Sequence, residues 1–154
     1  MPDRLLLDAM LGKLATYLRM CGYDAAYALD GVDDPAGGPT DDEILATARR
    51  SERTVLTRDR ELAARADDAL CIHSRDVPDQ LAELRAAGYE LSLDATPTRC
   101  GVCNGPVRPV GDEESLPAYA PDPAGTDCFR CRDCEQVFWK GSHWEDVRAT
   151  LRSV

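Results

Sequence analysis

The chain has 154 residues, of which 28 are acidic and 18 are basic, and its formal net charge at neutral pH is −10. A chain of this length can bury one ordinary core, whereas a second small module would need a staple of its own, such as a bound metal. The longest stretch without a charged residue, Cys100–Val107, is far shorter than the roughly 18 apolar residues of a membrane-spanning helix. The composition therefore predicts one domain with a small appendage and excludes a membrane span.

The N-terminal residues Met1–Arg4 lack both a basic leader with an apolar run and a small-residue cleavage site, so we expect a cytoplasmic protein. The basic residues are almost all arginine, because Lys13 and Lys140 are the only lysines. An acidic, alanine-rich and lysine-poor surface is halophilic-like, since proteins that work in strong salt use such a surface for solvation. The acidity counts against nucleic-acid binding, because nucleic-acid-binding proteins are usually basic.

Short apolar runs alternate with segments of helical spacing over residues 1–92. The runs typical of strands are Leu5–Leu7, Asp24–Leu29, Thr54–Thr57 and Ala69–Ile72. Each is followed by a candidate helix, and these helices begin near Leu11, Asp41, Glu61 and Val77. Four strand–helix alternations predict an α/β fold with an open, mainly parallel sheet, flanking helices and right-handed crossovers.

Turn and cap residues separate these elements. Gly22 and Gly88 can each end a helix, and the segment from Asp30 to Thr40 is rich in Gly, Pro and Asp and is predicted to be a loop. Either Thr40 or Asp41 can cap the helix that follows this loop. The sequence alone leaves that choice open.

Two C-x-x-C pairs stand in the C-terminal part, Cys100 with Cys103 and Cys131 with Cys134. Each pair offers two thiolates on one tight turn, and two such turns facing each other make a tetrahedral zinc site. Because such a site is closed by four ligands, we expect zinc to supply folding energy and no catalysis. The spacer is longer than the usual roughly 15–20 residues, which we interpret as an inserted loop.

The three remaining cysteines have other expected roles. Cys128 could pair with Cys131 in an alternative register, but we prefer Cys131 with Cys134 because the aromatic strand Val137–Trp139 follows directly. Cys21 and Cys71 are flanked by apolar residues and are expected to be small core residues.

The composition changes near residues 92–97, where a segment rich in Cys, Gly, Pro and aromatic residues begins. We therefore divide the chain into a domain at 1–92, a zinc ribbon at 97–145 and a helical tail at 146–154.

Four aspartates are candidates for a second, catalytic metal site. Asp8 and Asp59 follow the first and third predicted strands, and the carboxyl ends of parallel strands line the ligand crevice. Asp41 and Asp42 begin a helix that can reach the same edge. Carboxylates gathered there repel one another unless a cation lies among them, and oxygen ligands select Mg²⁺ or Mn²⁺, the metals of phosphodiester hydrolysis. Each aspartate could instead cap a helix or solvate a strand end.

Four motifs in chain order resemble the Mut-seven C-terminal ribonuclease family over nearly the whole chain, namely Leu7–Ala15, Thr57–Leu62, Cys100–Gly105 and Trp139–Trp144. The resemblance implies a PIN-like nuclease fold with an appended zinc ribbon. It also implies RNA as the substrate and a divalent metal held by aspartates.

The resemblance also implies roles for single residues. Asp8 matches the acid after the first strand, Asp59 matches the acid of the Thr-Arg-Asp motif, and Asp41 matches the acid that opens the next helix, with Asp42 as its competitor. The candidate RNA contacts are Lys13, Arg58, Arg60, His143 and Trp144. The alternative role of the charged residues is an ordinary solvated surface or ion pair. The alternative role of Trp144 is packing of the ribbon against the sheet. The surplus Cys128 and the strong acidity depart from the family pattern.

The predicted function is that of a metal-dependent endoribonuclease. The alternative is a non-catalytic zinc-ribbon adaptor that binds RNA or a protein partner. Saturable Mn²⁺ binding beyond one zinc, abolished by Asp8→Asn, would distinguish the two.

Overall fold

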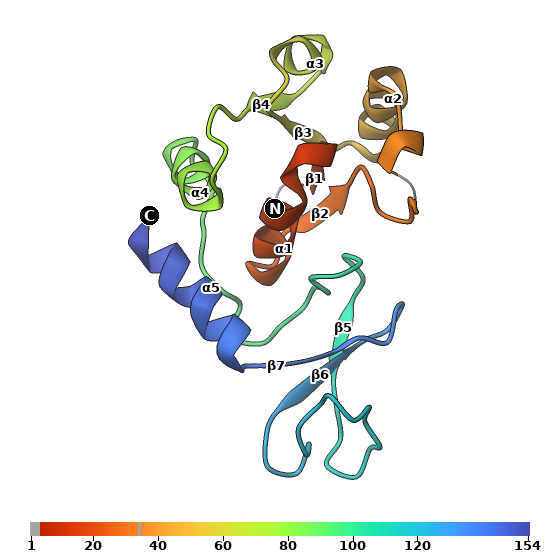
Figure 1. Ribbon diagram of the computed structural model, residues 1–154, viewed down its shortest axis with the longest axis vertical. Helices are drawn as coiled ribbons and strands as arrows, with labels where there is room; N and C mark the ends of the chain where they lie inside the picture. The colour runs from red at the N-terminus through yellow and green to blue at the C-terminus, as the bar shows by residue number, and fades with distance from the viewer. Residues whose placement is uncertain (1–3, 34) are drawn as a thin grey trace.

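The computed structural model describes residues 4–33 and 35–154, and Figure 1 shows how its elements are arranged. Residues 1–3, which belong to the segment expected to lack a leader, and residue 34 lie outside this range. The N-terminal part contains a sheet of four strands in the order β2-β1-β3-β4, namely β1 (Arg4–Leu7), β2 (Asp24–Tyr27), β3 (Thr54–Thr57) and β4 (Ala69–Cys71). All neighbouring strands of this sheet pair in parallel. The predicted α/β class with an open parallel sheet is confirmed.

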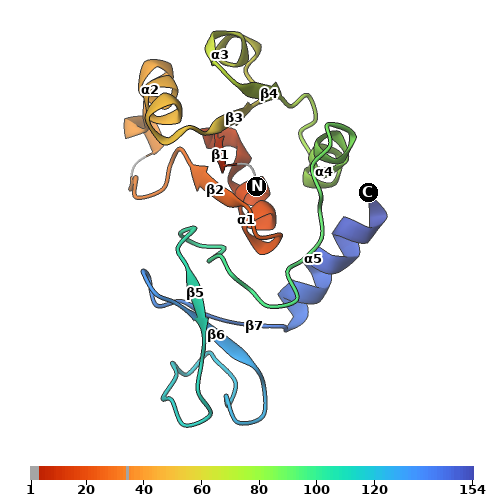
Figure 2. The ribbon, with the colours of Figure 1, turned by 180° about the vertical axis from the view of Figure 1, so that it is seen from behind.

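Helices cover both faces of the sheet, with α2 and α3 on one side and α1, α4 and α5 on the other (Figures 1 and 2). Their bounds are α1 (Gly12–Met20), α2 (Asp41–Ser51), α3 (Arg60–Arg65), α4 (Val77–Ala86) and α5 (Ser142–Ser153). Two short 3₁₀ turns, η1 (Ala9–Leu11) and η2 (Pro35–Gly37), precede α1 and α2. No helix in the described part of the chain is long and apolar enough to cross a membrane.

The three leucines of β1 explain why both faces are covered. Successive side chains of a strand point to opposite faces, so Leu5 and Leu7 enter one core while Leu6 enters the other. Each of the three is at most 3% exposed. Burial of one leucine on this scale contributes about 1.5–3 kcal/mol, so this short strand anchors both layers of helices.

The helix ends follow the expected capping chemistry. The hydroxyl of Thr40 accepts a 3.2 Å hydrogen bond from the backbone N–H of Glu43, so Thr40, rather than Asp41, caps α2. Beyond α1, Gly22 has a φ of +90°, which favours glycine. A Cβ at this position would lie 2.5 Å from the carboxylate of Asp94, which belongs to the segment after α4. This close approach also favours glycine at position 22.

Two predicted boundaries differ from the structure. β2 ends at Tyr27 instead of Leu29, because the carboxylate of Asp30 accepts a 3.0 Å hydrogen bond from the N–H of Tyr27 and turns the chain. The C-terminal helix begins at Ser142, earlier than the tail predicted from residue 146. Val147 and Leu151 of this helix belong to the same core as Leu5 and Leu7.

The remaining part of the chain forms a small antiparallel sheet in the order β5-β6-β7. Its strands are β5 (Val107–Pro109), β6 (Cys128–Cys131) and β7 (Val137–Trp139). The chain leaves β7 and enters α5, which packs beside α4 (Figure 2). The ribbon is therefore tied to the parallel sheet at both of its ends.

Candidate functional site

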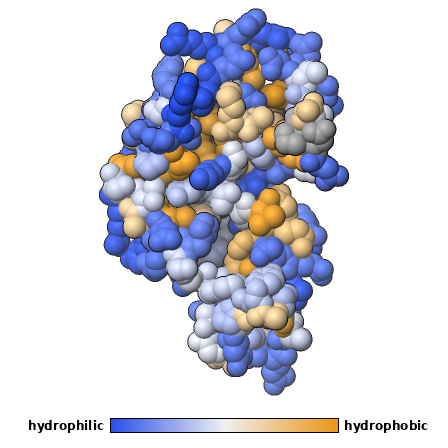
Figure 3. All heavy atoms as spheres, in the orientation of Figure 1, coloured by the Kyte–Doolittle hydropathy of each residue, from blue (hydrophilic) through white to orange (hydrophobic). Residues whose placement is uncertain are grey.

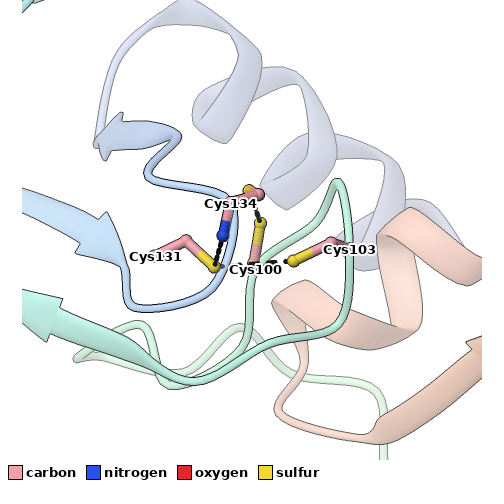
Figure 4. A group of neighbouring side chains, drawn as sticks. All are labelled: Cys100, Cys103, Cys131 and Cys134. Atoms are coloured by element: carbon pink, nitrogen blue, oxygen red, sulfur yellow. Dashed lines mark hydrogen bonds between the residues drawn. The ribbon is translucent and has the colours of Figure 1, made fainter.

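Four cysteine thiols meet between the two loops that carry the C-x-x-C pairs (Figure 4). The Sγ atoms of Cys100 and Cys134 are 3.6 Å apart. Those of Cys103 and Cys131 are 3.5 Å apart, and all four sulfurs lie within 4.8 Å of one another. Tetrahedral zinc with Zn–S bonds of about 2.3 Å requires sulfur separations of about 3.8 Å. The group could therefore hold a metal such as zinc.

Backbone N–H groups prepare these thiols for a metal. The N–H of Val102 donates to Cys100 Sγ at 3.3 Å, and those of Asp133 and Cys134 donate to Cys131 Sγ at 3.4 Å each. Burial alone would raise the pKa of Cys131, but the N–H groups of Cys134 and Asp133 lower it to about 7. Because the thiolate is the form that binds a metal, this pKa favours ligation by Cys131 at neutral pH, whereas burial raises the pKa of Cys100 and of Cys103.

The other cysteines described by the structure stay outside this group. The thiol of Cys128 is buried and donates to the carbonyl oxygen of Thr126 at 3.4 Å, and burial raises its pKa. The structure therefore places Cys128 outside the four-sulfur group. Burial also raises the pKa of Cys21 to about 12, in agreement with its packing against the main core.

The first cysteine loop is fastened to the edge of the parallel sheet by Asn104. Its side-chain oxygen accepts from the N–H of Ala25 at 3.0 Å, and its amide nitrogen donates to the Asp24 carboxylate at 2.7 Å. β2 is an edge strand, so Asn104 supplies a partner to an N–H that faces away from β1. The cysteine loop thus covers part of an exposed sheet edge.

Arg19 makes the second connection between the two parts of the chain. Its guanidinium is 3% exposed and donates to the carbonyl oxygens of Gly101 and Val102, both at 3.2 Å. It also donates to the carbonyl oxygen of Ala25 and to the carboxylate of Asp30, both at 2.8 Å. The roles of Arg19, Asp24 and Asn104 were not predicted from the sequence. The available signals were the position of Arg19 beside the apolar face of α1 and the placement of Asn104 directly after a cysteine pair.

Asp8 lies at the carboxyl end of β1 and is 9% exposed. One carboxylate oxygen accepts from the hydroxyl of Thr57 at 2.7 Å, and the other accepts from the N–H of Ala9 at 2.7 Å. Within residues 4–33 and 35–154, no basic side chain forms an ion pair with Asp8. Because buried charges are normally paired or bound to a metal, this carboxylate is a candidate ligand.

Asp59 lies at the end of the neighbouring strand, just before α3. Its Oδ1 atom accepts from the N–H groups of Glu61 and Leu62, at 2.9 and 3.3 Å, so Asp59 does cap a helix. The cap uses one carboxylate oxygen only. The N–H of Asp59 donates to the hydroxyl of Thr57 at 3.0 Å, so Thr57 connects Asp59 to Asp8.

Asp41 and Asp42 open α2 and are exposed. Asp42 forms an ion pair with Arg65 of α3. Asp42, and to a lesser degree Asp41, raises the pKa of Arg65, which places both acids near α3. They do not join Asp8 and Asp59 in one cluster. Within the described residues, the cysteines are the one group of three or more potential ligands close enough to hold an ion.

The predicted RNA contacts fall into two regions. Arg58 and Arg60 flank Asp59, and the Nε atom of Arg58 is buried with no hydrogen-bond partner among the described residues. Lys13 is exposed in the first turn of α1. His143 and Trp144 lie in the first turn of α5, far along the chain from the aspartates.

A pocket of about 680 Å³ separates the parallel sheet from the ribbon. Gly12, Thr16 and Tyr27 line it from the sheet side, and His143 and Trp144 line it from α5. In the space-filling view the molecule is hollowed between its larger upper part and the ribbon below (Figure 3). His143 and Trp144, two of the predicted RNA contacts, therefore line a cavity.

The fold and these sites define an α/β protein with acids at the carboxyl edge of a parallel sheet and a four-cysteine ribbon packed beside it. The family model of the Mut7-C RNAse domain matches residues 3–151. The chain therefore belongs to the Mut7-C RNAse domain family, and the resemblance seen in its four motifs is confirmed. No match was found among curated proteins or among solved structures.

Proposed function

We propose that the protein is a metal-dependent endoribonuclease whose active centre is built on Asp8 and Asp59. The observation that carries this proposal is the buried Asp8 carboxylate, which has no ion-pair partner in the described chain and is joined through Thr57 to the backbone of Asp59. Membership of an RNase domain family supports RNA as the substrate.

The donor set suits a hard divalent cation, because it consists of carboxylate oxygens. Mg²⁺ keeps several of its waters and takes one or two protein carboxylates, so it does not need a preformed cluster of three acids. Asp8 and Asp59 would hold the ion. Asp41 is the better third candidate, because Asp42 is engaged with Arg65. A bound Mg²⁺ or Mn²⁺ lowers the pKa of a water and stabilises charge on a phosphate.

Basic side chains next to the acids would hold the RNA backbone. Arg58 and Arg60 flank Asp59, and the buried Nε–H of Arg58 lacks an acceptor among the described residues. A buried donor of this kind is costly unless a ligand satisfies it, and a phosphate oxygen is a suitable acceptor. Lys13, which is exposed at the start of α1, can add a further phosphate contact.

The test is cleavage of defined single-stranded and structured RNAs, at several salt concentrations, by the parent protein and by Asp8→Asn and Asp59→Asn. We expect the parent to need Mg²⁺ or Mn²⁺ and both variants to lose cleavage while they keep their zinc. Asp67→Asn is the matched control, because Asp67 is exposed and its one ion pair among the described residues is with Arg49. Parental cleavage rates in Asp8→Asn and Asp59→Asn would refute the proposal.

One observation favours a second function, that of a non-catalytic adaptor that binds RNA or a protein partner. The described aspartates do not form a cluster of three ligands, whereas the cysteines form a complete site. Titration with Mn²⁺ separates the two functions. Saturable binding beyond the cysteine-bound metal, abolished by Asp8→Asn, supports the nuclease, and no second metal supports the adaptor.

A further inference from the structure

The pocket between the sheet and the ribbon has walls from two parts of the chain that are distant in sequence. Gly12 and Tyr27 line one side, and Trp139 and Gly141 line the other. A Cβ on Gly12 would lie 3.1 Å from the Tyr27 hydroxyl, and a Cβ on Gly141 would lie 2.7 Å from Trp139 Nε1. The two glycines therefore allow aromatic rings to lie directly against the backbone on both sides of the pocket.

Aromatic side chains dominate the ribbon side of the pocket. The chain contains two tryptophans, Trp139 and Trp144, and both line this pocket. The ring of Tyr119 stacks on that of Trp139 with 6.3 Å between centroids and an angle of 27°, which supports the indole from one face. Rigid aromatic surfaces of this kind stack on planar guests, and nucleobases are planar and have two π faces.

The charge around the pocket differs from that of the whole chain. The chain carries −10, whereas the charged residues of the pocket lining are Arg19, Arg99 and Asp30. Arg19 pairs with Asp30 at 2.8 Å and Arg99 lies 3.7 Å from Asp24, so the lining itself is close to neutral. The only two lysines flank the pocket. Lys13 follows the lining residue Gly12, and the ammonium of Lys140 lies 5.1 Å from the centre of the Trp144 ring. A nearly neutral lining with two lysines beside it repels a polyanion less than the rest of this acidic protein does.

Tyr27 connects the pocket with the acidic site. Its hydroxyl donates a 2.6 Å hydrogen bond to the carbonyl oxygen of Ala9, the residue directly after Asp8. The N–H of the same residue, Ala9, donates to the Asp8 carboxylate at 2.7 Å, so Ala9 links this wall of the pocket to the acidic site.

We propose that this pocket binds one unpaired nucleobase of a single-stranded RNA, stacked on Trp144 beside the Trp139–Tyr119 pair, and thereby places the neighbouring phosphodiester at Asp8. The volume of about 680 Å³ lies within the roughly 300–1,000 Å³ of small-ligand sites. The inference rests on the proposed function for the choice of RNA, but base binding itself requires no catalysis. It predicts a preference for single-stranded or looped RNA over duplex, in which the bases are paired and stacked.

Intrinsic fluorescence gives a direct test, because both tryptophans line the pocket. The parent protein without added Mg²⁺ or Mn²⁺ is titrated with a uridine homopolymer, an abasic strand of the same length, an RNA duplex and uridine monophosphate. We expect saturable quenching by the homopolymer and at least about fivefold weaker binding of the other three, since base stacking contributes about 1–3 kcal/mol per base. Equal affinity for the abasic strand overturns the proposal, and equal affinity for the monophosphate reveals a small-nucleotide site instead.

Variants of Trp144 provide the second arm. Trp144→Ala should weaken binding of the homopolymer about 5- to 150-fold, whereas Trp144→Phe, which keeps an aromatic face, should retain most of the affinity. Binding is followed here by anisotropy of a labelled strand, and thermal unfolding checks that each variant is folded. Unchanged affinity in Trp144→Ala overturns the proposal. If Trp144→Ala does not fold, the comparison of homopolymer with abasic strand on the parent protein decides.

The same proteins separate this inference from the proposed function. If quenching requires bases but RNA cleavage is absent or insensitive to Asp8→Asn, the base-binding pocket is supported and the nuclease proposal is rejected. Cleavage that requires Asp8 but has the parental KM in Trp144→Ala retains the nuclease and rejects the pocket.

Discussion

The hydroxyl of Thr57 donates a 2.7 Å hydrogen bond to the carboxylate of Asp8, and both side chains are buried. The same oxygen accepts a 3.0 Å hydrogen bond from the N–H of Asp59. Thr57 ends β3 and Asp8 directly follows the neighbouring strand β1, so pairing of these parallel strands sets their separation. One hydroxyl thus orients the buried acid and the start of α3 together.

Replacing Thr57 by valine tests this connection, because valine keeps the shape and removes the hydroxyl. We expect Thr57→Val to lower the free energy of unfolding by about 1–3 kcal/mol, since Asp8 loses a donor and the N–H of Asp59 loses an acceptor. If the acids bind a catalytic metal, Mn²⁺ affinity and RNA cleavage should fall about 10- to 100-fold, as for other partners of metal ligands. Urea unfolding, Mn²⁺ titration and cleavage rates measure the three effects.

Two further threonine variants serve as controls. Thr57→Ser keeps the hydroxyl and should retain Mn²⁺ affinity. Thr54→Val, at the other end of β3, removes a 2.6 Å hydrogen bond to the exposed Asp68 and should leave cleavage unchanged. Parental Mn²⁺ affinity in Thr57→Val would show that the hydroxyl stabilises the fold without serving a metal site.

The sequence predicted the elements that local chemistry determines. Leu5–Leu7 and Thr54–Thr57 were recognisable as buried strands because every side chain in them is apolar or β-branched. The position of Asp8 and Asp59 at the same sheet edge followed from the parallel order of these strands. The preferred cysteine register agrees with the four-sulfur group of the structure. Spacing alone also allowed Cys128 with Cys131, and the aromatic strand that follows Cys134 decided the preference.

The contacts between the sheet and the ribbon could not be predicted in the same way. Asn104 reaches Ala25 and Asp24 across about 80 positions of chain, and Arg19 reaches Gly101 across a similar distance. Neither periodicity nor motif spacing encodes such pairings, because they depend on how two separately folded surfaces meet. The pocket lies at this junction, so it could not be predicted from the sequence either. The family motif had nevertheless identified His143 and Trp144 as candidate RNA contacts.

Replacement of single cysteines should distinguish the cysteines that bind the metal from those that do not. Cys134→Ser should lose the bound zinc, and the ribbon should unfold with it, because the metal supplies much of the folding free energy of such small modules. Cys128→Ser should keep its zinc, since the Cys128 thiol donates to Thr126 and lies outside the four-sulfur group. Elemental analysis of the purified variants measures the metal. Loss of zinc in Cys128→Ser alone would reverse the assignment.

Asp24 should make the stability of the fold depend on pH. Burial would raise its pKa, but hydrogen bonds from Arg53 and Asn104 outweigh burial and lower the pKa below its usual value. The folded pKa is thus below the unfolded value of about 3.9, so the contribution of Asp24 is complete above about pH 4 and is lost as the pH falls through the folded pKa. We expect urea midpoints to drop in acid for the parent protein and to drop less for Asp24→Asn.

The carboxamide in Asp24→Asn cannot be protonated in this range, which is why its acid response should be smaller. Asp67→Asn controls for the loss of a carboxylate as such, because the ion pair that Asp67 forms with Arg49 is exposed. An acid response in Asp24→Asn equal to that of the parent would assign the pH dependence to other groups.

Arg19→Lys should loosen the ribbon from the sheet while it preserves the charge. The guanidinium of Arg19 serves four acceptors at once, including the carbonyl oxygens of Gly101 and Val102 in the cysteine loop. A lysine ammonium is a single point of charge and cannot reproduce the several directed hydrogen bonds of the planar guanidinium. We expect a loss of stability on the order of 3 kcal/mol, as for disruption of other buried ion pairs.

Urea unfolding and the emission maximum of the two tryptophans measure the effect of Arg19→Lys. Arg49→Lys is the matched control, because the Arg49–Asp67 pair is exposed and its change should alter stability by at most about 1 kcal/mol. If Arg19 only solvates α1, both variants should unfold at the parental midpoint with unchanged emission. A red-shifted emission confined to Arg19→Lys would instead show that the pocket opens when these hydrogen bonds are lost, because both tryptophans line that pocket.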